Sequence, residues 1–114
     1  MKTKKEIVNN WLPRYTGEKL DNFGEYILLT NFGNYVKMFA EMNNVNIVGM
    51  DKAMECATAN DITIINFGMG SPGAATIMDL LSAIEPKAVL FLGKCGGLKK
   101  RNKIGDLILP IAAI

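Results

Sequence analysis

Residues 66–73 read Asn-Phe-Gly-Met-Gly-Ser-Pro-Gly, a glycine-rich turn set between two regular runs. The apolar run 62–65 before it is typical of a buried strand, and the run 74–84 after it is typical of a helix. A strand, a glycine turn and a helix in this order present backbone N–H groups to an anion or a ribose hydroxyl. The same glycines also fit the G-x-G-x-x-G spacing of dinucleotide-binding turns. The stretch therefore predicts an α/β fold and leaves two kinds of ligand open.

Composition argues against several classes of protein. The 114 residues are 49% hydrophobic, which suffices for the core of one small domain and is too apolar for a disordered segment. The net charge of +2 predicts neither a nucleic-acid partner nor a membrane surface. The basic clusters 2–5 and 99–103 are typical of a solvated end and a solvated turn. No apolar run approaches the ~18 residues of a membrane span, and the N-terminus does not resemble a signal peptide. We therefore expect a cytoplasmic protein.

The chain has two cysteines, Cys56 and Cys95, and no histidine. Without histidine, these residues form neither a His-based catalytic triad nor a His-ligated metal site. We predict no metal and no cofactor. Cys56 is expected to be structural, and Cys95 has no apparent base that could activate it as a nucleophile.

Apolar runs alternate between strand-like and helix-like patterns along the chain. We expect helices over 4–12, where Pro13 ends the first, over 35–42, capped by Asn31 or Asn34, and from Ser71 or Pro72 to Ile84. Met38 and Met42 are expected to fill the core from the second helix. Residues 13–24 are predicted to form a loop, and residues 60–61 a turn. The predicted strands are 25–30, 45–50, 54–58, 61–67, 88–92 and 105–114.

Strands that alternate with helices predict a mixed or parallel sheet covered on both faces. Ligands of such sheets bind beyond the carboxyl ends of the strands. Three loops occupy such positions, Thr30–Asn34, Gly68–Gly73 and Gly93–Gly97. We therefore expect a candidate site where these loops meet.

A dinucleotide-binding domain is one hypothesis for these loops. It requires an acidic residue at the end of the next strand to bind the ribose hydroxyls. That place holds Gly93 and Lys94, and Pro72 is unusual within the fingerprint. Lys94 suits a 2′-phosphate, so an NADP-binding domain stays open as an alternative. Simple tight turns are a further interpretation, although two glycine loops at strand ends favour a ligand site.

Three motifs in the same order and spacing resemble the nucleoside phosphorylase and nucleosidase superfamily. They are Gly-Met-Gly-Ser-Pro at 68–72, Gly-Lys-Cys-Gly-Gly-Leu at 93–98 and Ile-Gly-Asp-Leu-Ile at 104–108. The resemblance extends over residues 25–114. It implies an α/β three-layer sandwich with a central mixed sheet, of which this chain is an incomplete N-terminal portion. Residues 1–24 are then a helix and loop extension.

The departures from the family pattern concern phosphate. Tyr35 and Phe91 stand at the positions where the family has phosphate-binding arginines. Lys94 replaces the Ser or Thr of the second motif, and Gly73 replaces a serine of the first. The resemblance therefore favours hydrolysis by water over phosphorolysis. Among hydrolytic members, the second motif and segment 11–17 most resemble AMP nucleosidases. A purine nucleoside phosphorylase and a methylthioadenosine-type nucleosidase are the alternatives.

The resemblance implies a site for a small nucleotide or nucleoside. The predicted substrate-binding residues are Asn31, Phe32, Gly70, Lys94, Cys95, Gly96 and Gly97. Asn31 and Phe32 take the place of the missing phosphate loop, and Lys94 either meets a phosphate oxygen or projects to solvent. The family's catalytic acid and ribose-binding residues are expected beyond Ile114. The resemblance thus implies the N-terminal part of a longer, homo-oligomeric enzyme, with no turnover by residues 1–114 alone.

Overall fold

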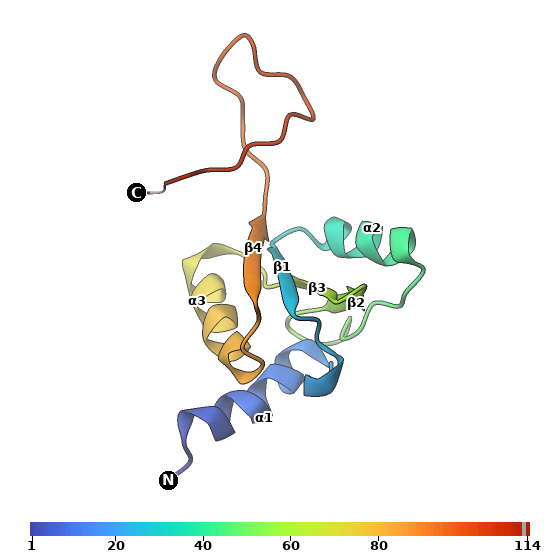
Figure 1. The fold of residues 1–114 in the computed structure, drawn as a ribbon, viewed down its shortest axis with the longest axis vertical. Coiled ribbons are helices and arrows are strands. Elements are labelled where there is room, and N and C mark those ends of the chain that lie inside the picture. The colour runs from blue at the N-terminus through green and yellow to red at the C-terminus, as the bar shows by residue number, and fades with distance from the viewer. Residues whose placement is uncertain (113) are drawn as a thin grey trace.

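The computed structural model describes residues 1–112 and 114, and Figure 1 shows their fold. In this part of the chain the elements are α1 (Lys4–Thr16), the 3₁₀ turn η1 (Leu20–Asn22), β1 (Tyr26–Thr30), α2 (Gly33–Asn43), β2 (Cys56–Ala59), β3 (Ile62–Asn66), α3 (Gly70–Leu80), the 3₁₀ turn η2 (Leu81–Ala83) and β4 (Ala88–Leu92). The strand predicted over 88–92 is confirmed at both ends. The third helix begins earlier than predicted and ends at Leu80, followed by η2.

The strands form a four-stranded mixed sheet in the order β2-β3-β1-β4. β1 pairs in parallel with both β3 and β4, whereas β2 pairs antiparallel with β3. The predicted turn at Asn60 and Asp61 joins β2 to β3, and both residues have the positive φ that such turns use (51° and 65°). Parallel neighbours need long crossover connections, which contain α2 and α3 here.

The sheet has helices on both faces (Figure 1). On one face, α1 and α3 pack on the sheet through a cluster that includes Leu12, Ile27 and Ile77. On the other face, α2 packs through Val36 and Ala40 against Ala57 and Ile64. The predicted α/β fold with a central mixed sheet between two helical layers is therefore confirmed. No helix within residues 1–112 and 114 has the length and apolarity needed to cross a membrane.

α1 is longer than predicted, because the helix continues through Pro13 to Thr16 and is followed by a left-handed Gly17. Proline lacks an N–H and so removes one helical hydrogen bond. The last turn nevertheless buries Leu12 and Thr16 completely, and Thr16 Oγ1 donates to Leu12 O at 2.9 Å. Tertiary packing thus outweighs the missing bond, and the predicted end near Pro13 is wrong.

Two predicted strands are not found among the described residues. Segment 45–50 makes only an isolated bridge between Val48 and Cys56 before the chain turns at Gly49, where φ is +77°. Residues 105–112 form no strand either. They belong to the long loop that leaves β4 and extends away from the sheet (Figure 1). Both segments have the apolar pattern of a strand, but a strand also needs a neighbour with which its backbone can pair.

Both cysteines are free thiols, Cys95 exposed and Cys56 fully buried between the sheet and α1. Burial, together with the Glu18 and Glu55 carboxylates, raises the pKa of the Cys56 thiol from 9.0 to about 12. The unfolded thiol therefore ionises near pH 9 while the folded thiol keeps its proton. Its contribution to stability is complete below pH 9 and is lost as the pH rises toward 12.

We expect the free energy of unfolding to fall with pH above about 9, by up to about 1.4 kcal/mol per pH unit from this group alone. Urea titrations at a series of pH values on either side of the unfolded pKa measure the slope. Cys56→Ala should flatten it, whereas Cys95→Ala, which removes the exposed thiol, should leave it unchanged. An equal slope in the wild type and Cys56→Ala would contradict the assignment.

Candidate active site

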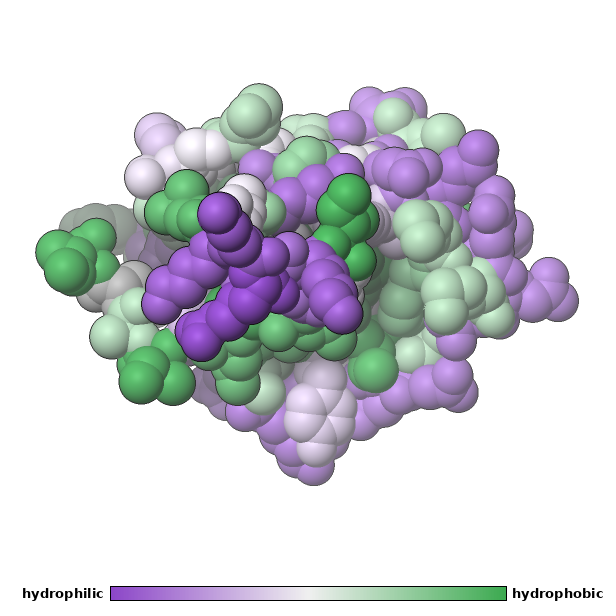
Figure 2. Space-filling view, turned by 90° about the horizontal axis from the view of Figure 1, so that it is seen from above, coloured by the Kyte–Doolittle hydropathy of each residue, from purple (hydrophilic) through white to green (hydrophobic). Residues whose placement is uncertain are grey.

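Three loops leave the sheet at the carboxyl ends of its parallel strands, as predicted. We refer to this end of the sheet as the site edge. The register pairs Thr30, the last residue of β1, with Asn66 of β3 and with Leu92 of β4. Because these strands are parallel and end in register, the loops that follow them begin side by side. The predicted meeting of the three loops at the carboxyl ends of the strands is therefore confirmed. In the view from above, strongly hydrophilic side chains lie nearest the viewer, with hydrophobic side chains around them (Figure 2).

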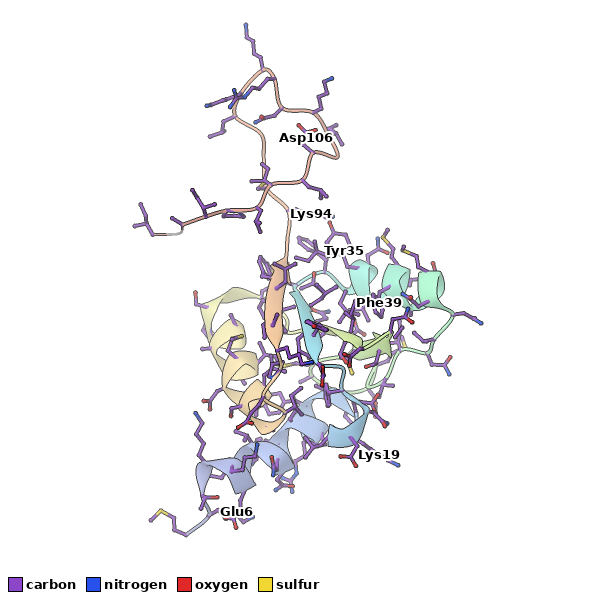
Figure 3. All side chains as sticks on the ribbon, in the orientation of Figure 1. Glu6, Lys19, Tyr35, Phe39, Lys94 and Asp106 are labelled. Atoms are coloured by element: carbon purple, nitrogen blue, oxygen red, sulfur yellow. The ribbon has the colours of Figure 1, made fainter. Side chains whose placement is uncertain are left out.

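Lys94 reaches from the third loop to the first. Its Nζ lies 4.5 Å from the centroid of the Phe32 ring and 5.3 Å from that of Tyr35. The two rings are 5.6 Å apart in an edge-to-face arrangement. Figure 3 labels Lys94 and Tyr35 at this edge. Two predicted site residues, Phe32 and Lys94, are thus brought together, and Tyr35 joins them.

The first loop leads directly into α2. The N-cap residue is Phe32, which has no side-chain capping bond, so the predicted cap at Asn31 or Asn34 is wrong. Instead, Phe32 N donates to Thr30 Oγ1 at 3.1 Å. Asn31 is half-buried, and its Oδ1 is buried without a hydrogen-bond partner among the residues that the structure describes. This oxygen is an unsatisfied acceptor near the carboxyl end of β1, and it is closed to solvent in this structure.

Asn66 anchors the glycine turn after β3. Its Oδ1 accepts from Gly68 N at 3.1 Å, and its Nδ2 donates to Glu55 Oε1 at 3.2 Å. α3 then begins at Gly70, which is exposed, and its N-cap residue Met69 makes no side-chain capping bond. The first N–H groups of α3 are therefore available to a ligand. Glu55 and Asn66 were not among the predicted site residues, although Asn66 is a polar residue that ends a β-branched run.

The third loop borders a hollow of about 860 Å³. The residues around it include Tyr35, Lys94, Cys95 and Gly97, together with residues 102–108. Gly96 is exposed in the same loop but does not line the hollow, and neither do Asn31 and Gly70. The predicted site residues therefore share one edge of the sheet, and only part of them line one cavity.

A second hollow of about 440 Å³ lies at the amino ends of β1 and β4. Lys87 and Glu25, which precede β4 and β1, form an ion pair of 2.5 Å there, and the hydrogen bond to Glu25 raises the pKa of Lys87 above its usual value. Ligands of parallel sheets bind at the carboxyl ends of the strands, so we assign the candidate site to that end.

Among residues 1–112 and 114, no three His, Cys, Asp or Glu residues gather as a metal site would require.

A family model described as the phosphorylase superfamily matches residues 25–114. The chain belongs to this superfamily, and the resemblance of its three motifs is therefore confirmed. Membership in this superfamily, over a range that includes residues 68–73, argues against the alternative of a dinucleotide-binding domain.

Two AMP nucleosidases are similar to this chain, one by sequence and one by structure. AMP nucleosidase from Escherichia coli K12 is 28% identical over 138 residues, which cover 89% of this chain and 28% of that protein. The crystal structure of AMP nucleosidase from Bacteroides thetaiotaomicron is 64% identical with a TM-score of 0.81, covering 84% of this chain and 42% of that one. The chain therefore spans less than half the length of these relatives.

Two phosphorylases are also similar. Guanosine phosphorylase from Halorubrum lacusprofundi is 34% identical over 53 residues, which cover 46% of this chain and 22% of that protein. Uridine phosphorylase from Schistosoma mansoni superposes with a TM-score of 0.51 at 20% identity, over 75% of this chain and 37% of that one. The last comparison concerns the fold alone.

Proposed function

We propose that the protein to which this chain belongs hydrolyses the N-glycosidic bond of AMP and releases adenine and ribose 5-phosphate. The observation that carries this proposal is the 64% identity to the Bacteroides AMP nucleosidase over 84% of this chain. The geometry agrees with it, since a cationic side chain, an unsatisfied acceptor and the start of α3 occur at one edge of the sheet.

The reaction replaces the bond between the ribose C1′ and the base with a bond to the oxygen of water. Positive charge develops on the sugar and negative charge on the leaving base, so the protein must stabilise both. In our proposal, the N–H groups at the start of α3 and the backbone of residues 95–97 contact the sugar and base. The proton for the base comes from an acid outside residues 1–114, as the resemblance implies.

Phosphorolysis is the competing function, and the similarity to guanosine phosphorylase favours it. It requires a bound inorganic phosphate as the nucleophile in place of water. Tyr35 and Phe91 stand where the resemblance places phosphate-binding arginines, and neither side chain carries a positive charge. This supports water as the attacking group.

Product identity tests the proposal. The full-length protein, incubated with AMP in a phosphate-free buffer, is expected to form adenine and ribose 5-phosphate in equal amounts, measured by chromatography. Adding phosphate should not change the products. A sugar 1-phosphate that forms only when phosphate is present would establish the phosphorylase instead. A cytoplasmic location and assembly as a homo-oligomer are parts of the same proposal, taken from the sequence and the resemblance.

A further inference from the structure

Lys94 is held in place by two aromatic rings at the candidate site. Its ammonium group lies over the ring of Phe32 and near that of Tyr35, at 4.5 and 5.3 Å from the centroids. We call these three residues the Lys94 cluster. A lysine side chain on a solvated loop is normally free to adopt many rotamers, and cation–π contacts restrict it. The cluster therefore favours one position for this positive charge, near the start of the three loops.

The fold itself brings the members of the cluster together. Phe32 is two residues beyond the end of β1, and Lys94 is two residues beyond the end of β4, while Thr30 and Leu92 pair in register. Equal offsets on adjacent parallel strands place the two positions side by side. Tyr35 lies in the first turn of α2, and its ring contacts that of Phe32. The contact is therefore a property of the sheet register rather than of loop conformation alone.

The ammonium keeps hydrogen-bond donors for a ligand. Ring faces attract its charge without accepting a conventional hydrogen bond, and within residues 1–112 and 114 Lys94 takes part in none of the ion pairs. Gly68 holds the equivalent position beyond β3, and a Cβ at Gly68 would meet nothing within 4 Å. There is thus open space over the glycine turn, about 10 Å across the sheet from the position of Lys94.

We propose that the Lys94 cluster recognises the phosphate group of a nucleoside monophosphate and so selects nucleotides over nucleosides. Lys94 contacts the phosphate, and Phe32 and Tyr35 are positioning residues that act through it. The inference rests on the proposed function, since it assigns a specificity to the same site. Free inorganic phosphate presents the same chemistry, so the experiment must distinguish the two sources of phosphate.

The experiment compares KM for AMP and for adenosine in the full-length protein and its variants. Lys94→Met keeps the apolar stem and removes the charge, so KM for AMP should rise about 10- to 100-fold while KM for adenosine stays unchanged. Lys94→Arg should restore most of the affinity for AMP. Lys37→Met, on an exposed position of α2, is the matched control for loss of one charge and should change neither constant.

The positioning role has its own signature. Tyr35→Leu should raise KM for AMP about two- to fivefold, with kcat nearly constant, because a ring is lost and the charge is kept. Tyr35→Phe preserves the ring and should behave as the wild type. An equal rise of KM for AMP and adenosine in Tyr35→Leu would instead indicate a general structural effect and would overturn the positioning role.

Calorimetric titration with AMP and with inorganic phosphate separates the remaining outcomes. Loss of AMP affinity in Lys94→Met supports the cluster, even if the wild type proves to release no adenine and the proposed function fails. If Lys94→Met weakens binding of inorganic phosphate but leaves the KM ratio of AMP to adenosine unchanged, Lys94 serves free phosphate and the inference is wrong. Unchanged binding of both ligands would also refute it.

Discussion

Replacing Gly49 with alanine is expected to lower the free energy of unfolding by about 4 kcal/mol. Gly49 has a φ of +77°, which side chains other than glycine adopt only with strain. An added Cβ would lie 1.9 Å from Thr16 O and 2.7 Å from Thr16 C. Thr16 is fully buried at the end of α1, so its backbone has no free space into which it could move. The clash would therefore separate α1 from the segment that leads into β2.

Gly68→Ala is the matched control for this experiment. Gly68 has a similar φ of +85°, but a Cβ there meets nothing within 4 Å. Gly68→Ala therefore introduces the backbone strain without the clash, and it should lower the free energy of unfolding by only about 1 kcal/mol. Urea denaturation followed by circular dichroism measures both. Equal losses in the two variants would show that the close contact between residues 16 and 49 has no energetic role.

Much of the sheet was predictable from sequence, because strands that are apolar over their whole length have a simple pattern. Residues 26–30, 62–66 and 88–92 were each expected within a residue or two of their observed bounds. Once these were taken as parallel strands, the loops after them had to share one edge. The position of the candidate site therefore followed from the topology, and the register confirmed it.

The predictions that were wrong concern apolar segments whose packing or pairing partner cannot be read from hydrophobicity alone. Segment 45–50 looks like a strand but pairs only at Val48, because Gly49 turns the chain against α1. Met38 and Met42 were expected in the core, yet they are 47% and 81% exposed. The sheet is covered at that point by Val36 and Ala40, one turn apart on the same face of α2. Apolar residues spread around a helix did not reveal which stripe would be buried.

Within the site, the sequence allowed individual residues to be predicted, but not the contacts between them. Phe32 and Lys94 were both expected to bind substrate, but they are 62 positions apart in the sequence. Their contact depends on the register between β1 and β4. The bond from Asn66 to Glu55 was missed for a similar reason, since it joins the end of β3 to the residue before β2. Such contacts follow from the three-dimensional arrangement and have no local sequence pattern.

Gly73→Val should lower kcat/KM for AMP about 100-fold, the second large effect that we expect. Gly73 lies in the first turn of α3, where an added Cβ would be 3.0 Å from Phe67 O and 3.4 Å from Phe67 Cδ2. Phe67 is buried and packs at 5.9 Å from Phe91, so it has little room to move. The branched side chain would push the start of α3 away from the end of β3. Because the glycine turn connects them, its N–H groups would leave the positions that substrate requires.

The loss in stability should leave the protein folded, so that the loss in activity is measured on the folded enzyme. Overpacking of this kind costs about 1–3 kcal/mol, and most of the core of α3 lies further along the helix, at Ile77 and Leu80. Ala75→Val is the control: it puts the same branched residue on the exposed face of α3 and should keep nearly full activity. Steady-state kinetics and urea denaturation of both variants separate the two effects. If Gly73→Val were as active as Ala75→Val, close packing of α3 on Phe67 would not be what positions the glycine turn.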